Sequence, residues 1–400
     1  MTFSASAQLF ERDRSGNGFF PQACPAMIST QIISDAAGFR DLRSEWNALL
    51  QACPSDCIFL TWEWAHTWWL HLAGKRRLHI IVVRRDGLLI GLAPLALRPA
   101  RLKRLMPWRV LEFLASGSVG SDYLSFLIRP GHEQIAVREI IGCLTRSGRM
   151  LELVRIEESS APMAELSWQF REAGWNSVSL TTNYSPYSIL SGHTWESYLD
   201  SLHANHRTNV GKMLRRLHKD FDVSLHVAAT EAERQWAMDV FIRLHLRRWS
   251  GKGGSTALNS KELIDFHRAF SKISLDRGWL KLYTLLLDGV PVSSLYVFKY
   301  GDVYHHYQSA FDPDYAKYSL GTVIIALAIK DAIEDGAVEF DFLHDNESYK
   351  YLWARQEREL IRLELFPAQG MGSVYRRAAA TKHWIKRLVH NCAPHRESKP

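Results

Sequence analysis

The stretch from Gly301 to Trp353 reads GDVYHHYQSAFDPDYAKYSLGTVIIALAIKDAIEDGAVEFDFLHDNESYKYLW. Its pattern predicts a strand, a glycine-bearing loop, an apolar helix over 319–335, a strand over Val338–Phe342 and a short second helix. The first turn of a helix leaves backbone N–H donors unpaired at the positive end of the helix dipole. This arrangement of strand, loop and helix therefore predicts an anion-binding site at the start of the helix.

The residues of this loop suit close contact with a bound phosphate. Ser319 is placed to cap the helix, and Gly321 lets a ligand approach the backbone. The candidate anion-binding residues are Lys317, Ser319, Leu320, Gly321 and Thr322.

The chain repeats two features at a spacing of about 200 residues, which indicates an internal duplication. An Asp-Gly turn joins two apolar strands at Asp86-Gly87 and again at Asp288-Gly289. Asp-Tyr pairs within 121–123 and 313–315 each precede a helical stretch and a strand. The sequence therefore predicts an α/β (α+β) fold of two similar halves, each with a mixed sheet flanked by helices. Only the second half has the glycine loop, so we expect the chemistry there.

The length of 400 residues, with 46% hydrophobic and 23% charged, indicates a globular chain of two domains. We expect a mobile tail over 1–28, an N-terminal half over 29–180, a C-terminal half over 181–370 and a basic helix and tail over 371–400. The aromatic stretch Thr61–His71 is interpreted as packing in the core or between the halves, with sugar stacking as the alternative.

The net charge of +7 comes mostly from the end of the chain, where residues 371–400 hold seven Lys and Arg and one Glu. The rest is close to neutral, which argues against a nucleic-acid partner. The basic segment is interpreted as a helix that docks on the body, with peripheral contact to an anionic membrane surface as the alternative.

The sequence favours a reduced, cytoplasmic protein without metal. There is no secretory signal, the apolar runs are too short to span a bilayer, and the five cysteines form no CxxC motif. The adjacent His305 and His306 would point to opposite faces of one strand and cannot chelate together.

Three further motifs carry a family resemblance: Arg207-Thr-Asn209, Phe340-Asp341-Phe342-Leu343 and Tyr349-Lys350. With the glycine loop, they resemble the GNAT-superfamily acetyltransferase family associated with cellulose and exopolysaccharide biosynthesis, which is akin to the Fem-type aminoacyl transferases. The resemblance implies a tandem N-acyltransferase that moves an acyl group, most simply acetyl from acetyl-CoA, to an amine on a sugar or small cell-envelope precursor.

The resemblance implies catalytic roles for Lys350, Tyr349 and Asp341. An ammonium at Lys350 would stabilise the oxyanion that develops on the carbonyl oxygen of the acyl group. We expect an exposed lysine, whose truncation lowers turnover far more than stability. Asp341 ends a strand where open α/β sheets bind ligands, and it is a candidate base. The alternative is that Asp341 caps backbone N–H groups of the following loop.

Substrate contacts are expected on a helix and on a strand. Arg207, with Asn209 and Lys212 on the same helix, would anchor anionic groups of the substrate, or else serve as a structural tie. His305 and Tyr307 share one strand face and are candidates to line the acyl groove. The chain departs from the family where it reads His344-Asp345, because glycine is common there, and this puts the loop geometry and the acyl size in doubt.

Two other functions stay open at this point. The donor is an aminoacyl-tRNA or an acyl carrier protein in the first alternative. In the second, the chain is a non-catalytic accessory protein of an exopolysaccharide complex, with the same fold and without turnover.

Overall fold

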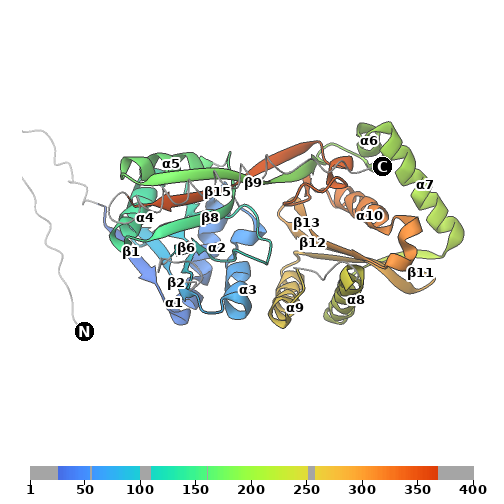
Figure 1. Ribbon diagram of the computed structural model, residues 1–400, viewed down its shortest axis with the longest axis horizontal. Helices are drawn as coiled ribbons and strands as arrows, with labels where there is room; N and C mark the ends of the chain where they lie inside the picture. Colours follow the sequence, from blue (N-terminus) through green and yellow to red (C-terminus); the bar gives the residue numbers. More distant parts are fainter. Residues whose placement is uncertain (1–25, 55, 100–109, 160, 251–256, 368–400) are drawn as a thin grey trace, which may run out of the picture.

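The computed structural model describes residues 26–54, 56–99, 110–159, 161–250 and 257–367. Two α/β bodies lie side by side and long strands run from one to the other (Figure 1). The predicted N-terminal tail up to residue 25 and the predicted basic segment 371–400 lie outside the described residues. Ile28, which the sequence assigned to the tail, is the first residue of β1.

The first half is built from short strands with helices packed around them. Its elements are β1 (Ile28–Ile33), α1 (Ala36–Asp41), α2 (Arg43–Ala52), η1 (Ile58–Leu60), α3 (Trp62–Leu72), β2 (Arg77–Leu78), β3 (Ile80–Arg85), β4 (Leu88–Ala93), β5 (Leu95–Leu97), β6 (Val110–Phe113), β7 (Leu127–Ile128), α4 (Glu133–Ser147), β8 (Met150–Glu157) and α5 (Ala161–Glu172).

The second half has longer strands, with α8 and α9 below its sheet and α10 and α7 above it in Figure 1. Its elements are β9 (Asn176–Ile189), α6 (Trp195–Ser201), α7 (Ala204–Asp220), β10 (Val223–Val227), α8 (Glu231–Ser250), α9 (Lys261–Asp276), β11 (Leu280–Leu287), β12 (Val290–Tyr300), β13 (Val303–Phe311), η2 (Pro313–Tyr318), α10 (Leu320–Glu334), β14 (Glu339–Asp341), η3 (Lys350–Leu352) and β15 (Gln356–Phe366).

The two Asp-Gly turns adopt the same backbone geometry. Asp86 and Gly87 have φ of 51° and 82°, and Asp288 and Gly289 have φ of 50° and 76°. Two successive positive φ angles are typical of the hairpin turn for which Asp-Gly is favoured. Each Asp carboxylate also accepts, at 2.8 Å, the backbone N–H of the residue that precedes the strand beside its hairpin, Met27 before β1 and Asp222 before β10. The predicted fold of two similar α/β halves is confirmed.

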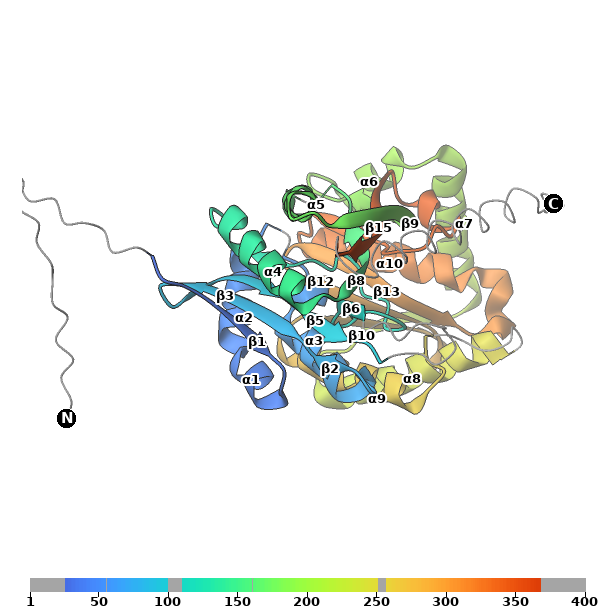
Figure 2. The same ribbon diagram turned by 60° about the vertical axis from the view of Figure 1, so that its left-hand side comes forward.

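The strands form a sheet in the order β1-β3-β4-β7 and an eleven-stranded sheet in the order β10-β11-β12-β13-β14-β9-β15-β8-β6-β5-β2. In the view of Figure 2, the first half lies in front and its strands lead back into the larger sheet. Within the second half, α10 connects β13 to β14, and these two strands run parallel.

The halves share their strands. β15, near the end of the described chain, pairs antiparallel with β9 on one side and with β8 of the first half on the other. The predicted boundary at residue 180 falls inside β9, which pairs with β15 at its start and with β14 at its end. The consecutive pairings of β8 with β15, β15 with β9 and β9 with β14 therefore join the two halves in one sheet.

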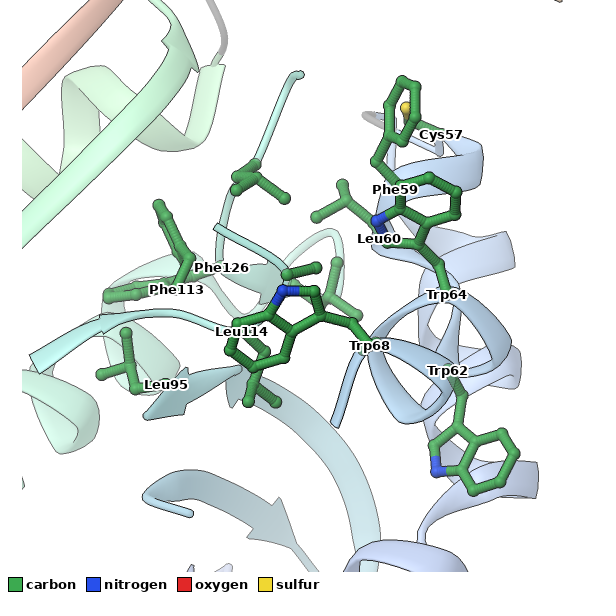
Figure 3. Close-up of a cluster of buried hydrophobic side chains, with 14 of the residues drawn as sticks. Cys57, Phe59, Leu60, Trp62, Trp64, Trp68, Leu95, Phe113, Leu114 and Phe126 are labelled. Carbon is green, nitrogen blue, oxygen red and sulfur yellow. The ribbon is translucent and has the colours of Figure 1, made fainter. Parts of the chain in front are cut away.

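The aromatic stretch forms part of the contact between the halves, as the packing interpretation expected. Trp64 on α3 is fully buried, and its ring meets Phe266 and Phe270 of α9 edge-on, with centroids 5.0 and 4.6 Å away. Its indole N–H donates to Ser121 Oγ at 2.8 Å. Figure 3 shows Trp64 beside Phe59 and the other buried side chains of the first half.

Because Trp64 fills space in both halves, Trp64→Ala should lower the free energy of unfolding by about 3–5 kcal/mol. Denaturant-induced unfolding followed by circular dichroism measures this change. Trp168 lies on α5 with its side chain 54% exposed, so Trp168→Ala should change the free energy by less than about 0.5 kcal/mol. Equal effects of the two variants would contradict the anchoring role of Trp64.

Candidate functional site

The parallel strands β13 and β14 diverge after three paired residues, which creates an opening at their C-terminal ends. Pairing covers Val303 to His305 on β13 and ends at Asp341 on β14, whereas β13 runs on to Phe311. The ladder between β12 and β13 has a register shift that leaves Tyr307 as an extra residue. Bulges of this kind are common beside active sites. We call the segment 306–311, which has no described strand on its β14 side, the open edge of β13.

The start of α10 lies at the end of this open edge, reached through η2. Ser319 has a left-handed φ of 53°, and its side chain makes no capping hydrogen bond, so the predicted side-chain cap is wrong. The first turn of α10 has no acidic residue. A Cβ at Gly321 would lie 3.6 Å from the Phe311 ring, which is ordinary contact. The helix dipole at this end therefore meets no negative side chain of its own first turn.

The equivalent helix of the first half has the opposite character. Glu133 lies in the first turn of α4, and its carboxylate accepts the backbone N–H of Gly131 at 3.0 Å. A carboxylate in the first turn brings negative charge to the start of the helix, so it disfavours a phosphate there.

Cationic side chains surround the start of α10. Arg247, at the end of α8, contacts the carboxylates of Asp312 and Asp314. The guanidinium of Arg248 lies 4.2 Å from the Phe311 ring centroid and donates to the Ser309 carbonyl at 3.3 Å. Lys317 is exposed. Arg248 thus brings a positive charge to the open edge while it contacts a ring and a carbonyl.

Asp341 is buried, and both of its carboxylate oxygens accept hydrogen bonds. Oδ1 accepts from Leu343 N at 2.8 Å, and Oδ2 accepts from the Tyr123 hydroxyl at 2.7 Å. Burial raises the pKa of Asp341, but the neighbouring His305, the charge of Arg358 and the hydrogen bond from Tyr123 outweigh burial and lower it. The hydrogen bond from Leu343 N agrees with the alternative interpretation, in which Asp341 caps backbone N–H groups of the following loop. The role of Asp341 as a base stays a prediction.

The expectation of an exposed Lys350 is wrong, because only 4% of this residue is exposed. Its Nζ donates to the backbone carbonyls of Leu343, His344 and Asp345, and it lies 2.8 Å from a carboxylate oxygen of Glu347. An ammonium has three donors, so these acceptors occupy all of them. Lys350 therefore holds the loop 343–345 in place through its backbone carbonyls. Its catalytic role stays a prediction.

His344 and Asp122 form a pair that the sequence did not place together. His344 Nδ1 lies 2.9 Å from Asp122 Oδ2, and the same oxygen accepts His344 N at 2.7 Å. Arg155 donates to the other oxygen of Asp122 at 2.9 Å. Burial raises the pKa of Asp122, but the contacts with His344 and the charge of Arg155 outweigh it and lower the pKa to about 2.

The strand before the loop alternates as predicted. His305 and Tyr307 both contact the Phe59 ring of the first half, and the Tyr307 hydroxyl donates to the Val119 carbonyl. The Nδ1 of His305 lies 3.6 Å from Asp341 Oδ2, beyond hydrogen-bond range. Both side chains therefore pack at the interface between the halves. The substrate-binding roles of His305 and Tyr307 stay predictions.

The opposite face of β13 points toward the loop. His306 lies near the rings of Phe342 and Tyr349, with centroids 5.7 and 6.4 Å away. Burial, and then the charge of Lys350, lower the pKa of His306 to about 3, so its ring is neutral. Tyr349 is half-buried, and burial raises the pKa of its hydroxyl, which therefore stays protonated.

Arg207, Asn209 and Lys212 lie on α7. The Arg207 guanidinium donates to Asp200 Oδ1 at 3.0 Å, which is the structural tie given as the alternative. Asn209 and Lys212 are exposed. Their part in substrate binding stays a prediction.

A protein-family model matches a large part of the second half of the chain. The model of the family described as "Acetyltransferase (GNAT) domain" matches residues 204–351. This range includes β13, the start of α10, β14 and the loop up to Lys350. Residues 204–351 are thus similar to a GNAT-type acetyltransferase domain.

Solved structures share the fold of nearly the whole chain at low sequence identity. FemX has a TM-score of 0.61 at 12% identity, over 87% of this chain and 99% of its own. A conserved protein of unknown function from Bacteroides thetaiotaomicron has a TM-score of 0.53 at 9% identity, over 84% of this chain and 100% of its own. The C-terminal domain of a putative lysylphosphatidylglycerol synthetase from Agrobacterium fabrum has a TM-score of 0.51 at 9% identity, over 86% of this chain and 96% of its own. No curated protein matches.

Two further observations concern membranes and metals. Among the described helices, none combines the length and the apolar character needed to cross a bilayer. Within the same part of the chain, no group of three or more His, Cys, Asp or Glu side chains is arranged to bind a metal ion.

Because Lys350 satisfies three buried carbonyls, Lys350→Ala should lower the free energy of unfolding by about 1–3 kcal/mol. Lys330→Ala, at an exposed position of α10, should change it by less than about 0.5 kcal/mol. Thermal and denaturant unfolding of both variants measure the difference. A Lys350→Ala variant as stable as the wild type would show that its ammonium does not hold the loop.

Proposed function

We propose that this protein is an N-acyltransferase that takes an acyl group from acyl-CoA and transfers it to an amine. The observation that carries the proposal is the contrast between the two equivalent helices. The first turn of α4 contains Glu133, whereas α10 begins without an acid in its first turn, at the end of an open strand edge. A helix start of this kind suits the pyrophosphate of CoA.

The open edge of β13 suits the rest of the donor. The pantetheine arm of CoA contains amides, which can pair with the free backbone groups of a strand edge as an added strand does. Arg248 and Lys317 would neutralise phosphate charge, and Leu320, Gly321 and Thr322 would present backbone to it. With CoA bound along the open edge of β13 in this way, its thioester would lie between the bulge at Tyr307 and the loop 343–349.

Tyr349 is the side chain that we assign to the leaving group. Its hydroxyl stays protonated because burial raises its pKa, so it can donate a hydrogen bond to the thiolate as the C–S bond breaks. Lys350 and Asp341 keep the surrounding loop in place through their bonds to its backbone. The His305 and Tyr307 side chains shape the first-half side of the groove.

The narrower parts of the proposal rest on the family resemblance. We propose acetyl as the acyl group, and an amine on a sugar or small cell-envelope or exopolysaccharide precursor as the acceptor, with Arg207, Asn209 and Lys212 toward its anionic groups. We place the protein in the cytoplasm, with peripheral contact at the inner membrane face through the basic segment 371–400. An aminoacyl or carrier-protein donor is the alternative within the same fold.

Acetyl-CoA should raise the melting temperature of the wild type, because a ligand at a hundred times its dissociation constant adds about 2.7 kcal/mol of stability. Gly321→Asp should abolish this shift and keep the fold, since its carboxylate repels the pyrophosphate and copies the acid found at the start of α4. The measurement is a thermal-shift series with CoA, acetyl-CoA and longer acyl-CoAs.

Gly142→Asp is the matched control, because Gly142 lies within α4 and a Cβ there would meet only the flexible end of Arg146. This variant should bind acetyl-CoA as the wild type does. If no CoA compound shifts the wild type, or if Gly321→Asp keeps full affinity, the donor site is not at the start of α10.

A further inference from the structure

We propose that His344 is the general base of the acyl transfer and that Asp122, from the first half, positions it. The inference rests on the proposed function, because it names the group that accepts the proton of the attacking amine. It concerns two residues that the family resemblance does not supply, one of which stands where glycine is common.

The pair has the geometry of an oriented base. Asp122 is fully buried and in contact with Arg155, and its Oδ2 lies 2.9 Å from His344 Nδ1. A carboxylate at one ring nitrogen sets the tautomer, so the proton lies on Nδ1 and Nε2 keeps its lone pair. The side chain of His344 is 19% exposed, so part of the ring is in contact with solvent. This is the arrangement of an imidazole ready to accept a proton.

The loop around His344 is strained and held at several points. Leu343 and Asp345 have left-handed φ angles of 56° and 78°, and a branched residue such as Leu343 rarely adopts one. The loop is tied by the bond of Leu343 N to Asp341, by the bond of His344 N to Asp122 and by the three bonds from Lys350. Strain of this kind persists where surrounding contacts over-determine it, and it is concentrated at functional sites.

Gly120 provides room for the ring. A Cβ at this position would lie 3.2 Å from Cε1 of His344, which is closer than most real contacts, and Gly120 has a φ of 68°. The first half therefore offers both a carboxylate and a side-chain-free surface to this one imidazole.

Several charged groups face His344 from the elements around it. Asp122 contacts Nδ1, and Asp345 Oδ2 lies 3.7 Å from Nε2 on an exposed side chain. The Lys350 ammonium is bound to the His344 carbonyl and is paired with Glu347. The imidazole therefore lies among two carboxylates and one ammonium, which carry opposite charges.

The amine nitrogen attacks the thioester carbonyl carbon, and the C–N bond forms while His344 Nε2 takes the N–H proton. The C–S bond then breaks, and CoA leaves as a thiolate with the electron pair. The proton passes from the imidazolium to solvent, and the thiolate takes up a proton in turn, so the products are the amide and free CoA.

The kinetic test uses the full chain with acetyl-CoA and an amine acceptor found by screening. His344→Gln should lower kcat by about 10²-fold or more and should remove the acid limb of the pH profile of kcat/KM. Asp122→Asn should lower kcat with little change in the KM for acetyl-CoA, and Gly120→Ala should act in the same direction by displacing the ring. His344→Ala should regain activity with added imidazole. The control is His71→Gln on α3, which should behave as the wild type.

A second measurement needs neither donor nor acceptor. In the proton spectrum of the wild type, the Nδ1–H of His344 should give a slowly exchanging downfield resonance, which is lost in His344→Gln and shifted in Asp122→Asn. If this resonance is missing, the pair is not formed and the proposal is overturned. If it is present but His344→Gln keeps the wild-type rate and pH profile, His344 is not the base, while the proposed function stands. A wild type that neither binds acetyl-CoA nor transfers its acyl group overturns the proposed function and this role together.

Discussion

The antiparallel ladder between β9 and β15 is the constraint on which the rest of the structure depends. It runs from Gln356 paired with Tyr187 to Phe366 paired with Asn176. Because β15 also pairs with β8, and β9 with β14, the two halves belong to one sheet. Backbone hydrogen bonds along such a length fix the relative position of the halves more firmly than side-chain contacts alone. Trp64 then fills the join on the other side of the molecule.

This fixed join explains how the first half reaches the chemistry of the second. Tyr123 donates to Asp341, Asp122 accepts from His344, and the Val119 carbonyl accepts from Tyr307. All three contacts come from one loop of the first half and lie against β13, β14 and the segment after it. A shift of about 1 Å between the halves would break these bonds, since hydrogen bonds weaken steeply with distance.

The two similar halves differ in the charge at the start of their equivalent helices, α4 and α10. The carboxylate of Glu133 occupies the start of α4, so the first half is poorly suited to an anionic ligand. The start of α10 lacks such a group and has Arg248 nearby. In our proposal one half binds the donor, and the other supplies the groups that orient the reacting residues.

The sequence by itself determined the local elements, because these depend on neighbouring residues. The Asp-Gly turns, the apolar helix α10 and the alternation of β13 follow from backbone preferences and side-chain periodicity. The same local signals identified the loop before α10 and the contrast between the halves. The side-chain cap at Ser319 failed because this residue adopts a left-handed conformation between two helices, a choice that the chain on both sides imposes.

Only the tertiary structure decided which residues meet at the site. Asp122 and His344 are 222 positions apart, and Tyr123 and Asp341 are 218 apart, so no local pattern links them. The burial of Lys350 is also a property of the folded loop, whose carbonyls converge on one point only after Leu343 and Asp345 take left-handed angles. Local preferences act over a few residues, whereas these contacts exist because the ladder of β9 and β15 brings distant segments together.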